Sequence, residues 1–142
     1  MDPLDGEVLV AELDGRPIGL VGWHEGGQFS NPDEAEVRVL LVEPDARRRG
    51  AATALLAGAE ARMAGAGVRA AWLVSTNDNI EALAFYGHRG WLVSAILAGA
   101  VDEARRTLKP GIPAIAENGI PIRDELVLRR SLSRLATAPK GA

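Results

Sequence analysis

A strand followed by a turn of small residues and then a helix constrains this chain more than any other feature. Residues 37–44 form a strand-like apolar run, and residues 51–64 have apolar side chains spaced three and four apart, which predicts a helix. Between them, segment 47–52 holds three arginines, a glycine and two alanines. The first N–H groups of a helix have no partner within it, and the helix dipole makes that end electropositive. The turn therefore predicts a cradle for a phosphate group.

The bulk composition narrows the class of protein. A length of 142 residues predicts one domain, with a core of about residues 8–131 and a flexible tail at 132–142. The net charge of −3 argues against a nucleic-acid-binding protein. With no cysteine and only two histidines, we expect neither thiolate chemistry nor a metal site. We see no membrane-spanning run and no signal peptide, so we expect a cytoplasmic protein that does not bind membranes.

The order of predicted elements indicates a mixed α/β fold. Two short apolar runs around an Asp-Gly turn predict a hairpin, and the partial loss of alternation in 35–42 fits a doubly buried strand or a β-bulge. The remaining predicted elements are a strand at 70–74, a helix between Asn79 and Gly87, a strand at 91–98, a loop at 99–121 with one helical turn at 102–107, and a strand at 125–130. Because a hairpin comes first along the chain and strand–helix–strand crossovers follow it, the order predicts a sheet with both antiparallel and parallel strands.

Two motifs about thirty residues apart occur together in this chain. The first is Arg47-x-x-Gly50-x-Ala52, and the second starts at Asn79 and continues through Ala82 and Tyr86 to Gly90-Trp91. Together they resemble the GCN5-related N-acetyltransferase (GNAT) family, in which a Phe usually stands where Trp91 does. The resemblance covers roughly residues 8–98 and the last strand. It implies a mixed, mostly antiparallel sheet with a central, splayed parallel strand pair and flanking helices.

The resemblance also implies acetyl-coenzyme A as co-substrate, with no metal. In the family the pyrophosphate lies on the turn, and the pantetheine arm pairs with the edge of the preceding strand like an added β-strand. The cofactor-binding positions that match are Leu41, Val42, Arg47, Arg48, Arg49, Gly50, Ala51, Ala52, Thr53 and Asn79. Small residues permit close backbone approach, and the arginines supply positive charge.

The implied reaction moves an acetyl group from the thioester to a primary amine by direct attack. An alkyl amine with a pKa near 10.4 is mostly protonated at pH 7, so a carboxylate can help to remove its proton. Glu36 occupies a position where many relatives carry such a glutamate, with Glu34 and Glu43 as rivals. Tyr86, the single tyrosine of the chain, matches the residue that protonates the leaving sulfur.

Each of these residues also has an ordinary structural interpretation. The arginines could be a solvated helix start, Tyr86 a core aromatic residue, Asn79 only a helix cap, and Glu36 a solvent-facing strand residue. His24 and His88 could act as bases, although surface histidines are more common. The competing functional hypothesis is a non-catalytic module of the same fold that binds acyl-CoA or another protein.

The chain departs from the family at its beginning, because only about seven residues precede the first predicted strand. Most relatives begin with a strand and one or two helices that help to wall the acceptor site. We therefore expect the acceptor pocket to be completed by the 99–122 loop or by a second subunit, and we predict a homodimer. The acceptor, a small-molecule or peptide amine, is not specified by the sequence.

Overall fold

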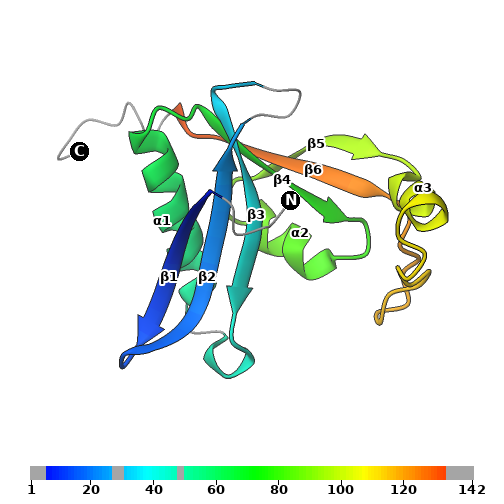
Figure 1. The fold of residues 1–142 in the computed structure, drawn as a ribbon, viewed down its shortest axis with the longest axis horizontal. Coiled ribbons are helices and arrows are strands. Elements are labelled where there is room, and N and C mark those ends of the chain that lie inside the picture. Colours follow the sequence, from blue (N-terminus) through cyan, green and yellow to red (C-terminus); the bar gives the residue numbers. More distant parts are fainter. Residues whose placement is uncertain (1–5, 27–30, 48–49, 134–142) are drawn as a thin grey trace. The chain divides into compact units, whose positions relative to one another are not determined.

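A computed structural model describes residues 6–26, 31–47 and 50–133 (Figure 1). The chain forms two compact units. Unit 1 comprises residues 1–72 and 131–142, and unit 2 comprises residues 73–130. Strand β4 (Ala70–Thr76) begins in unit 1 and ends in unit 2. The prediction of one domain with a core at 8–131 stays a prediction, and most of the predicted tail, 134–142, lies outside the described residues.

The predicted hairpin opens unit 1. Strands β1 (Glu7–Leu13) and β2 (Arg16–Glu25) pair in antiparallel fashion across a two-residue turn. Both turn residues have positive φ, 52° at Asp14 and 77° at Gly15. That geometry suits the twist of a hairpin and explains why an Asp-Gly pair stands here.

Strand β3 (Glu34–Val42) was predicted to be either a doubly buried strand or a strand with a β-bulge, and its pairing distinguishes the two. It pairs antiparallel with β2, where the register shifts so that Arg38 is an extra residue opposite the Gly22–Trp23 step. The strand therefore contains a bulge, and its last residues are not doubly buried, since Leu41 is 60% exposed. Its parallel pairing with β4 covers only Glu34–Glu36 against Ala70–Trp72.

Helix α1 (Ala51–Gly65) packs against β1, β2 and β3 within unit 1 (Figure 1). Its buried face consists of residues at the predicted spacing: Leu55, Leu56, Ala59, Met63 and Ala64. The sheet contributes Val21 and Ala35, both without exposed surface. Leu132 is also fully buried, and its N–H donates to the Arg69 carbonyl at 2.8 Å. Burial of these apolar side chains is what holds unit 1 together.

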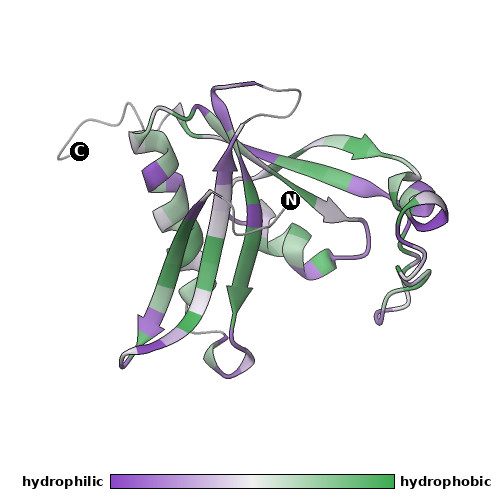
Figure 2. Ribbon diagram, viewed as in Figure 1, coloured by the Kyte–Doolittle hydropathy of each residue, from purple (hydrophilic) through white to green (hydrophobic). Residues whose placement is uncertain are grey.

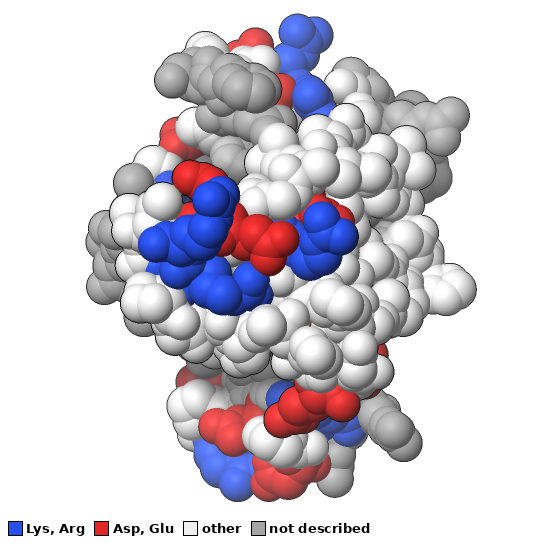
Figure 3. All heavy atoms as spheres, turned by 90° about the vertical axis from the view of Figure 1, so that its right-hand side faces the viewer, with Lys and Arg blue, Asp and Glu red and all other residues white. Residues whose placement is uncertain are grey.

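Unit 2 contains the end of β4, α2 (Ile80–Gly87), β5 (Leu92–Leu97), α3 (Ala100–Thr107) and most of β6 (Glu125–Ser131). Its strands are ordered β4-β6-β5, and β5 and β6 are antiparallel. Around α3, positive and negative side chains are intermixed (Figure 3). Helix α3 is longer than the predicted single turn, because Gly99 starts it in the left-handed conformation, with φ of 73°.

Two polar side chains hold the connection from α3 to β6 in place through hydrogen bonds. Arg105 donates to the main-chain carbonyls of Ile112, Pro113 and Ile122 at 2.8–2.9 Å, and to Asp102 at 2.7 Å. Asn77, at the end of β4, accepts the N–H groups of Arg123 and Asp124 at 2.9 Å and donates to the Pro121 carbonyl. The long loop is therefore an ordered segment of unit 2.

The predicted fold class is confirmed. Among the described residues, the pairs β1–β2, β2–β3 and β5–β6 are antiparallel, β3 and β4 form a parallel pair, and three α-helices accompany the strands.

Candidate functional site

Gly50 starts α1 in the left-handed conformation, with φ of 80°. A Cβ added there would meet nothing within 4 Å, so backbone conformation rather than lack of room requires glycine. Gly50 has no side chain with which to cap this helix. The N–H groups at its start therefore remain suited to an anion, as the sequence predicts.

The other residues predicted for the cradle are distributed around this helix start. Ala51, Ala52 and Thr53 form the first helical turn. Arg47 is exposed and ends the short 3-10 helix η2 (Pro44–Ala46), and its Nε donates to the Val42 carbonyl at 3.4 Å. Arg48 and Arg49 lie outside the described residues. The described part of the cradle thus combines backbone donors with one arginine.

The end of β3 leads directly into this turn. Within unit 1, Leu41 and Val42 pair with β2 through Leu20 and Gly19. A side chain at position 19 would clash with the Leu41 carbonyl, since a Cβ there would lie 2.7 Å from that oxygen. Gly19 thus permits the close strand contact that holds the predicted pantetheine-binding strand in place.

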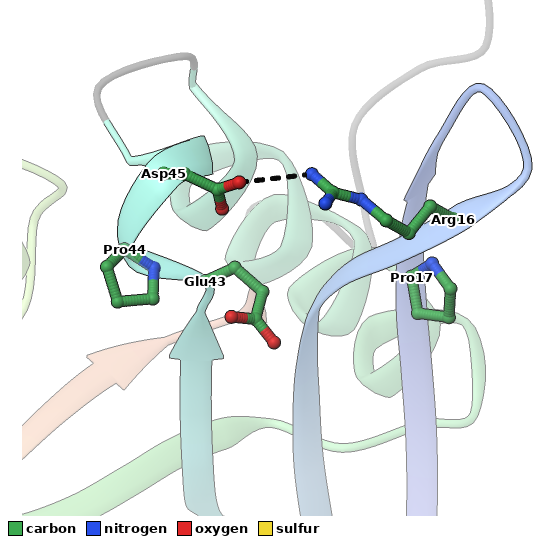
Figure 4. A pocket seen from close by; sticks show the side chains of 5 residues that line it. All are labelled: Arg16, Pro17, Glu43, Pro44 and Asp45. Carbon is green, nitrogen blue, oxygen red and sulfur yellow. Dashed lines mark hydrogen bonds and ion pairs between the residues drawn. The ribbon is translucent and has the colours of Figure 1, made fainter.

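A hollow of about 460 Å³ lies between the β1–β2 turn and the connection from β3 to α1 (Figure 4). It is lined by Arg16, Pro17, Glu43, Pro44 and Asp45. Arg16 pairs with Asp45 at 3.3 Å, and both side chains are more than half exposed. Two carboxylates and one paired arginine do not suit a phosphate, so anionic groups are better accommodated at the start of α1.

Glu36 is held by the residue that forms the bulge. Arg38 Nε donates to Glu36 Oε1 at 2.9 Å, and the Glu36 side chain is 22% exposed. His24 lies opposite Glu36 on β2. Of the rival carboxylates, Glu34 is buried and accepts a hydrogen bond from Asn31, whereas Glu43 is exposed. Glu36 is therefore an oriented, partly accessible carboxylate, which sequence reasoning could not distinguish from a plain surface residue.

In unit 2, Asn79 is the N-cap of α2. Its Oδ1 accepts the N–H of Ala82 at 3.1 Å, which explains the Asn-x-x-Ala spacing as a cap bonded to the third helical residue. The cap uses the oxygen of the amide and leaves its Nδ2 group as a donor. Capping and ligand binding by Asn79 are therefore compatible.

The second half of this motif is a helix C-terminal stop. The Trp91 N–H donates to the Tyr86 carbonyl at 3.1 Å and the Gly90 N–H to the Gly87 carbonyl at 3.2 Å, while Gly90 has φ of 89°. This is the Schellman arrangement, which requires glycine at that position. The ring centroids of Tyr86 and Trp91 lie 5.4 Å apart, so the spacing of tyrosine, glycine and tryptophan also sets an aromatic contact.

Tyr86 itself is buried among aromatic rings. It packs edge-on against Phe85 at 5.2 Å and against Trp91, and it is 9% exposed. Burial raises its pKa from 10.0 to about 12, because the charged form is poorly solvated there. Among the described residues its hydroxyl has no hydrogen-bond partner. The hydroxyl is therefore a neutral donor at pH 7.

Sequence reasoning missed Arg38, Asn77 and Arg105 as organising residues. Arg105 and Asn77 bind groups that the fold brings near, whereas Arg38 bonds to Glu36 only two residues away. Only Asn77 had a signal, as the first residue of the Asn-Asp-Asn cluster before α2.

Residues 2–91 match the sequence profile described as the Acetyltransferase (GNAT) family. The chain belongs to the GNAT family. The predicted resemblance is confirmed, and membership supports acetyl transfer as the general activity.

Two kinds of relatives agree with this assignment. The uncharacterized protein YdhI of Bacillus subtilis is 37% identical over 129 residues, which is 91% of this chain and 75% of YdhI. A Bacillus subtilis acetyltransferase solved in complex with CoA has a TM-score of 0.75 at 21% identity, covering 89% of this chain and 76% of that one. An IAA acetyltransferase from Bacillus cereus has a TM-score of 0.71 at 23% identity, covering 87% and 76%. At these identities, the two structures show the GNAT fold alone.

No helix in the described ranges has the length and apolar character needed to span a bilayer. Within the same residues, no group of three or more His, Asp or Glu side chains is arranged to hold a metal ion.

Proposed function

We propose that this GNAT-family member transfers the acetyl group of acetyl-CoA directly to a primary amine. The observation that carries the proposal is the start of α1 behind the left-handed Gly50, immediately after a strand that matches the family's pantetheine-binding strand. The similar Bacillus subtilis acetyltransferase solved with CoA supports the choice of co-substrate.

Different groups of the chain would bind different parts of the coenzyme. The N–H groups at the start of α1, together with Arg47, would hold the pyrophosphate. The backbone of Leu41 and Val42 would pair with the pantetheine amides. Asn79 would donate from Nδ2 to the same arm while its Oδ1 continues to cap α2.

In the reaction, the amine nitrogen bonds to the acetyl carbon and the carbon–sulfur bond breaks. The amine loses a proton to Glu36, directly or through water, and the departing sulfur accepts a hydrogen bond from Tyr86. A thiol pKa near 8.5 lies well below the pKa of Tyr86, about 12, so full proton transfer from Tyr86 would be uphill by about 5 kcal/mol. Tyr86 therefore stabilises the sulfur chiefly as a hydrogen-bond donor.

Thermal unfolding with acetyl-CoA tests the donor site. Saturation at 100 times the dissociation constant should add about 2.7 kcal/mol of stability. Free acetate is the control and should leave the melting temperature unchanged. If acetyl-CoA does not shift it either, the proposed co-substrate is wrong.

Turnover on a panel of amines tests the chemistry. We expect Tyr86→Phe and Glu36→Gln each to lower kcat by about 100-fold, the lower end for acid–base groups. The matched control is Glu43→Gln, which should keep full activity. Should acetyl-CoA bind while no amine is acetylated, the chain is better described as an acyl-CoA-binding module.

A further inference from the structure

Strand β5 is an unprotected edge of unit 2. In the strand order β4-β6-β5 its outer edge has no neighbouring strand among the described residues. Proteins commonly protect such edges with charged residues or proline. None of the six residues of β5 is charged or a proline, and apolar residues colour most of its ribbon green in Figure 2.

Four apolar side chains of β5 are exposed along this edge, two on each face of the strand. The exposed fractions are 71% for Leu92, 53% for Val93, 63% for Ile96 and 44% for Leu97. Single exposed apolar residues are normal on a protein surface, whereas four beside an unpaired strand edge favour an interaction through that edge. The exposed β5 residues therefore indicate a surface that binds a partner.

A bulge determines which of these side chains share a face. The register of β5 against β6 shifts between Val93 and Ala95, so Ser94 has no cross-strand partner of its own. Leu92 and Leu97 lie opposite Arg129 and Glu125, which are four residues apart and share a face of β6. Val93 and Ile96 lie opposite Leu128 and Leu126, which share the other face.

We propose that β5 pairs antiparallel with β5 of a second copy of this chain. A two-fold axis through the middle of the strand sets Leu92 opposite the partner's Leu97, and Val93 opposite the partner's Ile96. Directly opposed residues must point to the same face. Because of the bulge, both of these pairs satisfy that condition, so the strand is complementary to itself, as an isologous interface requires.

The charges on β6 favour the same orientation. Arg129 lies beside Leu92, and Glu125 lies beside Leu97. Antiparallel pairing places the arginine end of one copy in line with the glutamate end of the other, whereas parallel pairing would align like charges. Three strand spacings separate these groups by about 14 Å, beyond the ~8 Å screening length at physiological salt. The charges are therefore compatible with the antiparallel orientation and add little affinity.

The exposed apolar area of β5 limits the expected affinity of the dimer. A fully buried aliphatic side chain covers about 60–120 Å², so four half-exposed ones cover roughly 150–300 Å² per copy. A stable interface buries about 800 Å² per partner. Even with strand–strand hydrogen bonds, the dimer should be weak, and its population should depend on protein concentration.

Sedimentation velocity over a range of concentrations tests the interface. The unmodified chain should shift from monomer to dimer as concentration rises, and Ile96→Lys should abolish that shift. The matched control is Val10→Lys on the edge strand β1, where Val10 is 52% exposed. This control should dimerise like the unmodified chain. A chain that is monomeric at every concentration, or a shift abolished by Val10→Lys but not by Ile96→Lys, would overturn the proposal.

A cysteine crosslink tests the register and does not depend on how Ile96→Lys folds. The chain has no cysteine, so the double variant Leu92→Cys/Leu97→Cys has only the introduced pair. Within one strand these positions lie about 16 Å apart, too far for a disulfide, whose Cα atoms lie about 4.4–6.8 Å apart. Oxidation should yield a covalent dimer from the double variant and from an equal mixture of the two single variants. It should yield none from either single variant alone, and an uncrosslinked double variant would contradict the pairing.

Discussion

The start of α1 and the end of α2 provide candidate binding groups in opposite ways. At α1 the groups belong to the backbone, and a left-handed glycine sets their direction on an exposed turn. At α2 the group is one side chain, Tyr86, fixed by the packing of Phe85 and Trp91. A backbone site is sensitive to conformation, whereas a packed side-chain site is sensitive to volume and solvation.

The largest effect that separates the two regions is expected from truncating Tyr86. Tyr86→Ala removes a buried ring and should cost about 3–5 kcal/mol of unfolding free energy. Tyr86→Phe keeps the ring and is the control, with a change below about 1 kcal/mol at pH 7. Urea unfolding of both variants measures the difference. A cost under 1 kcal/mol for Tyr86→Ala would mean that this region is not fixed by packing.

Raising the pH should destabilise the region around Tyr86, because ionised tyrosine is poorly solvated when it is buried. The folded-state pKa of Tyr86, about 12, lies above its unfolded value of 10.0. The stabilisation is therefore complete below pH 10 and is lost as the pH rises through 12, by up to about 3 kcal/mol. Phenylalanine does not ionise, so the unmodified chain should lose that amount of stability relative to Tyr86→Phe over this range.

The same tyrosine can be titrated directly. Because it is the single tyrosine of the chain, ultraviolet absorbance reports its ionisation without interference from others. A midpoint near pH 10 in the folded protein would show that burial does not shift it.

At α1, the corresponding test changes the backbone and leaves packing intact. Gly50→Ala should cost about 1–2 kcal/mol, the cost of a left-handed conformation for an L-residue. Gly65, the last residue of the same helix, has no positive φ, and a Cβ there would meet nothing within 4 Å. Gly65→Ala should therefore be neutral or stabilising by up to about 1 kcal/mol. Equal effects at both glycines, measured by thermal unfolding, would refute the conformational argument.

The smallest effect is expected at the helix cap. Asn79→Ala loses the bond to the Ala82 N–H and should cost about 1 kcal/mol. Asn79→Asp keeps a cap oxygen and should retain stability, but it lacks the Nδ2 donor. Weaker acetyl-CoA binding by Asn79→Asp at unchanged stability would separate the two roles of this residue. Unchanged binding would restrict Asn79 to capping.

The sequence predicted those parts of the fold and site that depend on local patterns. Gly50, Asn79 and the tyrosine–glycine–tryptophan spacing each reflect a helix end, whose requirements are met within a few residues. The hairpin and the buried face of α1 were predictable for the same reason.

The remaining features depend on contacts that no local pattern encodes. At Arg38 the sequence could not choose between a bulge and a doubly buried strand, because pairing with β2 determines the register. The predicted long loop after β5, with its helical turn, is held at its end by Asn77, more than forty residues away in sequence. Such partners are determined by tertiary structure.

Arg105 has a consequence for how the segment between α3 and β6 can change during evolution. Its guanidinium recognises main-chain oxygens of Ile112, Pro113 and Ile122, and every residue type carries such an oxygen. Substitutions along this segment would therefore leave the anchoring contacts available. A fixed anchor with replaceable side chains allows the segment to diversify in sequence while its path is retained.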